Sequence, residues 1–103
     1  MQISKVSLDD LASLIAIENS LFESDQISKR QFIYNIKKQK LFYVANIDNQ
    51  VAGYILCFEY KKIIRVYSLA IDKTHQGKGV GKALLMNVCD NTSKNIFLEV
   101  NVN

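Results

Sequence analysis

The sequence predicts a single α/β domain in which a mixed, mainly antiparallel sheet is flanked by helices. Its 103 residues are enough for one domain, and the chain contains no repeat, linker or low-complexity segment. Its apolar periodicity changes along the chain between the alternation typical of strands and the spacing typical of helices. A hydrophobic fraction of 49% excludes a disordered chain, and charges that interrupt every apolar run exclude a membrane span.

Two capping patterns predict where the first two helices begin. Ser7 with Asp10 precedes an apolar stripe at helical spacing that ends at Leu21. Ser28 with Gln31 precedes a second stripe, and lysines follow it where a helix C-terminus favours cations. The second stripe consists of Phe32, Ile33 and Ile36.

Runs rich in β-branched and aromatic residues predict the strands. Turn signals at Asp48-Asn49 and Lys61-Lys62 join three of these runs into an antiparallel meander, and Gly53 inside one of them indicates a bulge or a close backbone approach. A helix from Gly79 to Asn91 precedes the last strand. The element order is therefore β-α-α-β-β-β-α-β, with strands over Gln2 to Val6, Leu41 to Ile47, Val51 to Tyr60, Ile63 to Ile71 and Ile96 to Val102.

The net charge of +3 arises in one part of the chain. Residues 61–82 contain six basic residues against Asp72 alone, a local charge of +5. In the second half of this window the positive charges coincide with a glycine-rich loop that opens a helix, which favours an anion such as phosphate. Lys61-Lys62 suits the exposed tip of a hairpin equally well.

Cysteine usage and the start of the chain predict a cytoplasmic protein. Cys57 and Cys89 lie in apolar segments without a pairing spacing, so we expect reduced, partly buried thiols. The first ten residues are too polar for a secretory signal. Neither a nucleic-acid partner nor a membrane partner is expected.

The most specific feature is the loop QGKGVGK at residues 76–82, between a predicted strand and a predicted helix. Its three alternate glycines expose backbone N–H groups to a ligand, which favours phosphate. A Walker loop would need Gly at position 76 and Ser or Thr at position 83, where this chain has Gln76 and Ala83. A Rossmann fingerprint would need Gly in place of Lys82, although the strand-helix-strand order and Glu99 fit it, so a dinucleotide-binding fragment stays an alternative.

The spacing Gln-x-x-Gly-x-Gly from Gln76 to Gly81 resembles the acetyl-CoA motif of the GCN5-related N-acetyltransferases (GNAT). The element order is similar to the first two-thirds of that family's domain, so the resemblance covers the whole chain. Leu69 to Asp72 and Leu98 to Val100 look most like the branch that acetylates protein N-terminal α-amines, such as ribosomal-protein-alanine acetyltransferase. The resemblance implies a GNAT-like fold and an enzyme that transfers acetyl from acetyl-CoA to a primary amine.

The resemblance also implies which residues bind the co-substrate. The CoA pyrophosphate would lie on the backbone amides of the loop at the helix N-terminus, with added charge from two lysines. The pantetheine arm would pair with the backbone of the preceding strand. The implied acetyl-CoA-binding residues are Leu69, Ala70, Ile71, Gln76, Gly77, Lys78, Gly79, Val80, Gly81 and Lys82.

Acetyl transfer requires a neutral amine, so a base must take one proton from the ammonium group. The resemblance and the apolar neighbours Leu98 and Val100 favour Glu99 as the catalytic base. His75, the only histidine, is the competing candidate at the phosphate end of the loop. Two cysteines and one histidine at scattered positions do not predict a metal site.

The chain departs from the family at its C-terminal end. It stops at Asn103, before the helix and two strands that carry the family's CoA-binding Asn and its general-acid Tyr, and Asn101 replaces a basic residue usual in the most similar branch. We therefore expect one C-terminally truncated domain over residues 1–103, which self-associates through the unpaired edge of Ile96 to Val102. A non-catalytic CoA-binding or interaction module is the alternative function.

Overall fold

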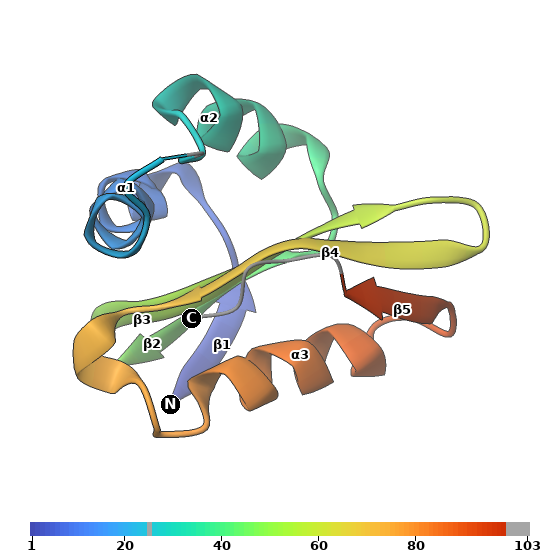
Figure 1. The fold of residues 1–103 in the computed structure, drawn as a ribbon. Helices are drawn as coiled ribbons and strands as arrows, with labels where there is room; N and C mark the ends of the chain where they lie inside the picture. Colours follow the sequence, from blue (N-terminus) through green and yellow to red (C-terminus); the bar gives the residue numbers. More distant parts are fainter. Residues whose placement is uncertain (25, 99–103) are drawn as a thin grey trace.

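A five-stranded sheet forms the middle layer of the fold (Figure 1). The computed structural model describes residues 1–24 and 26–98. The first four strands pair antiparallel, and the fifth pairs parallel with the fourth, which confirms the predicted mixed sheet. The strands lie side by side in chain order: β1 (Gln2–Lys5), β2 (Phe42–Ile47), β3 (Gln50–Glu59), β4 (Ile63–Ile71) and β5 (Asn95–Leu98).

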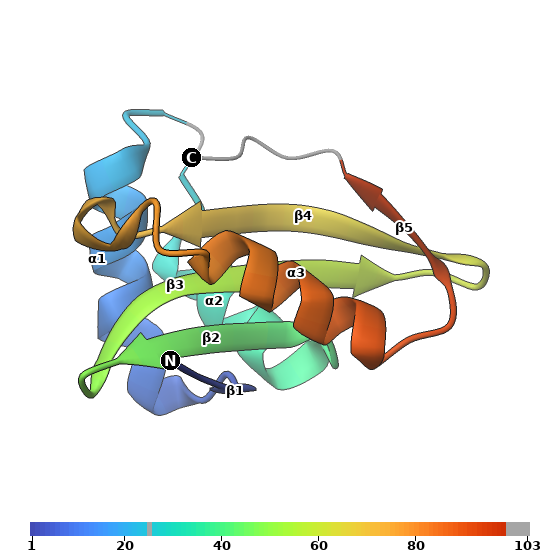
Figure 2. The same ribbon diagram turned by 90° about the horizontal axis from the view of Figure 1, so that it is seen from below.

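Three α-helices cover the two faces of the sheet. The helices α1 (Leu11–Leu21) and α2 (Lys29–Lys38) lie on one face, and α3 (Val80–Asp90) lies on the other (Figures 1 and 2). Each face buries its own apolar cluster against its helices. The predicted element order is confirmed, with two short 3-10 helices that the sequence did not predict, η1 (Leu8–Asp10) and η2 (Lys73–His75).

The predicted cap of α2 and the predicted Asp48-Asn49 turn are both present in the structure. The Ser28 N–H donates to Gln31 Oε1 at 2.8 Å and the Gln31 N–H donates to Ser28 Oγ at 3.2 Å, so this capping box starts α2 as predicted. Asp48 and Asn49 have φ angles of 52° and 63°, which suit a two-residue hairpin turn. The apolar stripe of α2 differs from the prediction, because Asn35 is buried in place of Ile33.

Both cysteines are free thiols, as predicted. Cys57 is buried in β3, and burial raises the pKa of its thiol to about 12. Cys89 is exposed on α3, unlike the expected partial burial. In the part of the chain that the structure describes, no helix is long and apolar enough to cross a membrane.

A β-bulge interrupts the middle of β4. Leu56 pairs with Ser68 while its neighbour Cys57 pairs with Val66, so Tyr67 is an extra residue on β4. Bulges of this kind bend the strand and increase its twist. The second half of β4 therefore follows a different direction from the first half.

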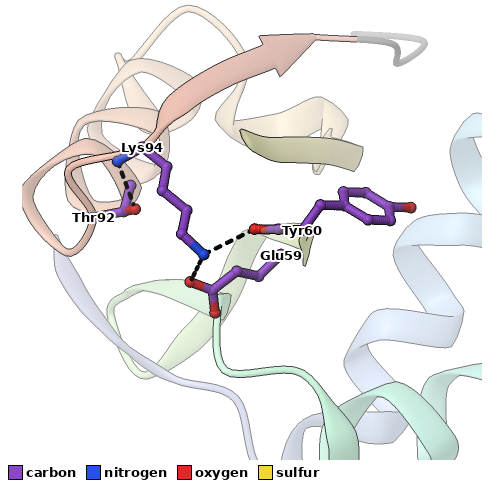
Figure 3. A network of polar contacts seen from close by, with 4 residues as sticks. All are labelled: Glu59, Tyr60, Thr92 and Lys94. Carbon is purple, nitrogen blue, oxygen red and sulfur yellow. Dashed lines mark hydrogen bonds and ion pairs between the residues drawn. The ribbon is translucent and has the colours of Figure 1, made fainter. Parts of the chain in front are cut away.

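Lys94 ties the start of β5 to the end of β3 (Figure 3). Its ammonium donates to a carboxylate oxygen of Glu59 at 3.0 Å and to the carbonyl oxygen of Tyr60 at 2.8 Å. Its backbone N–H donates to Thr92 Oγ1 at 3.1 Å. The bond from Lys94 holds the pKa of the Glu59 carboxyl below its ordinary value. The two bonds from the Lys94 ammonium fix the start of β5 beside the end of β3.

Gly53 allows β3 to approach β4 closely, as the sequence predicted. A Cβ atom at this position would lie 2.8 Å from the carbonyl oxygen of Ala70 and 2.7 Å from Ile71 Cδ1. The register of β3 against β2 also shifts here, because Gly53 pairs with Ala45 while Val51 pairs with Asn46. Both features that were expected of this glycine, the bulge and the close approach, are therefore present.

We predict that Gly53→Ala lowers the free energy of unfolding by about 1–3 kcal/mol, because its methyl group would overlap the backbone of β4. Gly81→Ala is the matched control, since its methyl group would meet Ile71 at an ordinary 3.8 Å and alanine favours a helix. Urea unfolding followed by circular dichroism compares the two variants. Unchanged stability in Gly53→Ala would contradict the close approach.

Candidate functional site

The outer edge of β4 differs between the two halves of the strand. β5 pairs with β4 from Ile63 to Val66, and within residues 1–24 and 26–98 no strand pairs with this edge from Tyr67 to Ile71. All described residues of β5 pair with β4, and the two strands start together beside the β3–β4 turn (Figure 2). This described pairing ends just before the bulge at Tyr67. Free backbone N–H and C=O groups along such an edge can pair with an extended ligand.

The glycine-rich loop follows this edge directly and opens α3. Gly77 and Gly79 have φ angles of 83° and 79°, a conformation that strongly favours glycine. The first backbone bond of α3 runs from the Ala83 N–H to the carbonyl oxygen of Gly79 at 3.0 Å. The amides of residues 80–82 precede that bond and have no partner within the helix, at the positive end of its dipole. This geometry suits a phosphate group.

The three glycines of the loop have two different roles. A Cβ atom on Gly77 or Gly79 would have no protein atom within 4 Å, so both positions are open to a ligand. A Cβ atom on Gly81 would instead face Ile71 at 3.8 Å, inside the protein. Gly77 and Gly79 therefore have open space where a side chain would be, whereas at Gly81 that space faces Ile71.

A pocket of about 280 Å³ joins the end of β4 to the loop. Seven of the ten residues that the sequence analysis assigned to acetyl-CoA binding line it, together with His75. Ala70 is buried on the opposite face of β4, and Lys78 and Lys82 are exposed outside the pocket. The seven lining residues are Leu69, Ile71, Gln76, Gly77, Gly79, Val80 and Gly81.

Gln76 holds the loop against the strand. Its side-chain amide donates to the carbonyl oxygen of Ile71 at 3.2 Å, so the last carbonyl group of β4 is already occupied. The N–H of Asp72 donates to the carbonyl oxygen of Ala52 at 2.8 Å, and the N–H of His75 donates to that of Asp72 at 2.9 Å. These three bonds hold the start of the loop, and the bond from Ala83 to Gly79 holds its end in α3, which preorganises its amides.

The structure divides the lysines of the basic window into two separate groups, with Arg65 between them on β4. Lys61-Lys62 form the turn between β3 and β4, at the far end of β4 from the loop (Figure 2). Three lysines against Asp72 remain in η2, the loop and the first turn of α3, a local charge of +2. The Lys78 ammonium donates to His75 Nδ1 at 3.2 Å, which places this imidazole at the phosphate end of the site.

Glu99, the predicted base, lies outside the described residues, as does the predicted strand beyond Leu98. Among residues 1–24 and 26–98 no three His, Cys, Asp or Glu side chains are grouped to hold a metal ion. The structure therefore describes the part of the site that is predicted to bind acetyl-CoA. The role of Glu99 as the base stays a prediction.

Sequence reasoning missed a buried polar cluster behind β4. Glu18 on α1 is 2% exposed, and its carboxylate accepts the N–H of Ile27 at 2.7 Å and the hydroxyl of Tyr54. The Tyr54 hydroxyl is also 2.9 Å from Ser68 Oγ on β4. Burial and the bond to Glu18 raise the pKa of Tyr54. One feature of the sequence could have indicated this cluster: Glu18 places a carboxylate within the apolar stripe of α1, three residues after Ile15.

Comparison with known proteins supports the resemblance seen in the sequence. The family model for an acetyltransferase (GNAT) domain matches residues 9–103. An uncharacterized N-acetyltransferase of Methanocaldococcus jannaschii is 35% identical over 85 residues, which are 82% of this chain and 54% of that protein. The chain thus spans about half the length of this curated relative.

Solved structures share the fold. The PaiA N-acetyltransferase of Thermoplasma acidophilum, solved with coenzyme A, has a TM-score of 0.77 at 20% identity, covering 87% of this chain and 70% of that one. The ribosomal-protein-S18-alanine N-acetyltransferase of Escherichia coli has a TM-score of 0.76 at 22% identity, covering 87% and 57%. With the family model matching nearly the whole chain, this protein belongs to the GNAT acetyltransferase domain family.

Proposed function

We propose that the protein is an N-acetyltransferase that transfers acetyl from acetyl-CoA to a primary amine. The observation that carries the proposal is the junction of two features: a strand edge that pairs with none of the described strands, and a glycine loop whose amides lack helical partners. Family membership and the coenzyme A in the PaiA structure support it. A dinucleotide-binding fragment is disfavoured, because the sheet is mainly antiparallel.

The geometry suits an extended co-substrate. The pyrophosphate would accept hydrogen bonds from amides of Gly77 to Lys82, with Lys78 and Lys82 adding positive charge. The pantetheine arm would extend back along β4 beside Leu69 and Ala70, using backbone groups that β5 leaves free. Three strand residues span roughly 10 Å, so the thioester would lie near Tyr67 and Ser68, just beyond the described pairing of β4 with β5.

The proposed reaction is direct acetyl transfer. The ammonium of the acceptor loses one proton to a base, and the neutral nitrogen then attacks the thioester carbonyl. A C–N bond forms, the C–S bond breaks, and the CoA sulfur leaves with a proton. Glu99 is the base that the resemblance proposes, and it sits in the sequence one residue after the last described residue of β5.

A protein N-terminal α-amine is the acceptor that we propose, for example that of a ribosomal protein. Two observations support it: the Leu69 to Asp72 segment resembles that branch, and the fold is similar to an enzyme named for alanine of ribosomal protein S18. Because such acceptors are made in the cytoplasm, we propose that the protein acts there.

Self-association through the outer edge of the last strand also stays a proposal. β5 is the final strand in the described sheet, and the side chains of Phe97 and Leu98 are 50% and 54% exposed. An apolar strand at the edge of a sheet is a template for pairing with a second chain. A second copy of this protein would cover both side chains.

We predict that Gly79→Val weakens acetyl-CoA binding at least roughly tenfold, or about 1.4 kcal/mol, because valine strains the positive φ and blocks approach to the backbone. Gly81→Ala is the control, because its methyl group faces Ile71 and should leave the affinity nearly unchanged. Isothermal titration calorimetry gives both affinities. Equal affinity of the unaltered protein for NAD would contradict acetyl-CoA as the natural ligand.

Glu99→Gln is expected to reduce turnover by roughly 10²–10⁴-fold with little effect on acetyl-CoA affinity. The loss should shrink as the pH rises, because more of the acceptor amine is then neutral without help. Release of free CoA, with a peptide that begins with an unblocked alanine, measures the rate. His75→Ala is the comparison, and a protein that tolerates Glu99→Gln but loses activity with His75→Ala would overturn the assignment.

A further inference from the structure

We propose that single-stranded RNA binds to a basic and aromatic surface where α2 ends beside the β3–β4 turn. Unpaired bases would stack on the exposed tyrosines of this surface, and its lysines would contact the RNA phosphates. The inference goes beyond the proposed function, because it needs neither acetyl-CoA nor an acceptor amine. It departs from the sequence analysis, which expected no nucleic-acid partner.

An open pocket of about 300 Å³ lies between the second half of α2 and the end of β3. Three aromatic side chains line it: Tyr34 on α2, Phe58 in β3 and Tyr60 just after β3. Tyr34 and Tyr60 are 55% and 47% exposed, whereas Phe58 is partly buried. The Phe58 ring packs on the ring of Tyr67, with centroids 4.7 Å apart. Two rings that face solvent beside a pocket are available to stack with a flat ligand.

Polar contacts hold the ring of Tyr34 and the backbone of Tyr60. The Lys38 ammonium donates to the Tyr34 hydroxyl oxygen at 2.7 Å, which places a positive charge beside that ring. The Tyr60 N–H donates to the carbonyl oxygen of Ile63 at 2.8 Å, and its own carbonyl oxygen accepts from Lys94. In Figure 3 the Tyr60 ring extends away from the Lys94 ammonium. Side chains that are already held in place lose less entropy when a ligand binds.

Exposed lysines gather at this end of the molecule. α2 ends in two lysines, and two more form the β3–β4 turn after Tyr60. A lysine on β1 joins them, because its ammonium donates to the carbonyl oxygens of residues 39 and 40, between α2 and β2. Figure 2 shows the start of β2 and the β3–β4 turn toward the same end of the sheet. The six exposed lysines are Lys5, Lys37, Lys38, Lys40, Lys61 and Lys62.

The carboxylates at this end leave most of the positive charge in place. Glu59 forms an ion pair with Lys94 at 3.0 Å, so these two charges compensate each other. The bond from Lys94, with a contribution from Lys40, lowers the pKa of the Glu59 carboxyl. Asp90 ends α3, on the other face of the sheet from α2. Even with Asp90 counted, six lysines give this surface a positive potential that attracts a phosphate chain.

Folding separates charges that are mixed along the sequence. Residues 1–60 contain six basic and seven acidic residues, so their composition does not predict a basic surface. In the structure, Asp9, Asp10 and Asp72 line a different pocket of about 500 Å³ beside the β2–β3 turn. That turn lies at the opposite end of the sheet from the β3–β4 turn (Figure 2). RNA would therefore be repelled from one end of the sheet and attracted to the other.

The exposed tyrosines favour RNA over an acidic protein segment. An acidic peptide would pair with the lysines and leave the rings of Tyr34 and Tyr60 without a matching group. Every nucleobase has a flat face that stacks on such rings, whatever its sequence. The bases of a duplex stack on one another, whereas loops and ends of RNA present unpaired bases to side chains. The surface therefore suits an unpaired segment of RNA.

Fluorescence anisotropy of the full chain with a labelled oligouridine of about twelve nucleotides tests the stacking. The oligouridine should bind more tightly than an RNA duplex of the same length, and more tightly than polyglutamate of equal charge. Tyr34→Ala and Tyr60→Ala should each weaken binding at least about fivefold, the lower end of the effect of one stacked base. Tyr34→Phe keeps the ring and should bind the oligouridine nearly as well as the unaltered protein.

The salt dependence of the same binding tests the lysines. Replacement of Lys61 and Lys62 together by glutamine should reduce the slope of log K against log salt by about 1.4, because each phosphate contact on a single strand contributes roughly 0.7. Lys29→Gln is the matched control, since Lys29 is an exposed lysine at the opposite end of α2. Its slope should be nearly that of the unaltered protein.

Acetyl-CoA distinguishes this surface from the glycine loop, which is the other candidate for binding phosphate. Saturating acetyl-CoA should leave the oligouridine affinity unchanged, because the loop lies at the far end of β4 from the β3–β4 turn. Competition between the two ligands would overturn the proposal and place the RNA on the loop. Equal binding of polyglutamate, with no effect of Tyr34→Ala or Tyr60→Ala, would also overturn it and indicate an acidic protein partner. So would a lack of oligouridine binding at low salt.

Discussion

The edge of β4 beyond Val66, which pairs with none of the described strands, is the constraint on which the proposed site depends. Lys94 binds Glu59 and Tyr60 and so holds the start of β5 to the end of β3, beside the turn that leads into β4. The bulge at Tyr67 then redirects β4 just where its described pairing with β5 stops. Unpaired backbone groups on a strand edge invite association with other chains unless something covers them. An extended co-substrate with its own amide groups would satisfy that edge.

The glycine loop and the strand edge are complementary parts of one surface. Positive φ angles at Gly77 and Gly79 turn the chain from β4 into α3 without placing side chains above the amides. Gln76 occupies the last carbonyl group of β4, which directs a ligand toward the amides of the loop. Behind the strand, the cluster of Glu18, Tyr54 and Ser68 supports the same edge from the opposite face. The proposed anion binding, the proposed edge pairing and the support behind the strand therefore involve different elements around β4.

Local chemistry explains why much of this architecture could be predicted from the sequence. Capping boxes, the Asp48-Asn49 turn and the glycine loop act over a few residues, and the predicted elements match the observed ones closely. The bulge at Tyr67 and the burial of Glu18 could not be predicted, because they depend on partners distant in sequence. Tyr54 is 36 residues from Glu18, and nothing near either residue indicates the contact. The glycine loop was therefore predictable from the sequence. The hydrogen-bonded cluster of Glu18, Tyr54 and Ser68 behind β4 was not.

Amide hydrogen exchange of the full chain with and without acetyl-CoA tests the central claim most directly. If the co-substrate lies on the loop and along the free edge of β4, acetyl-CoA should slow exchange at residues 77–82 and 67–70 together. The β3–β4 turn at Lys61-Lys62 should not change, because it lies at the far end of the strand. Slower exchange confined to that turn, with the loop and the edge unchanged, would contradict the account.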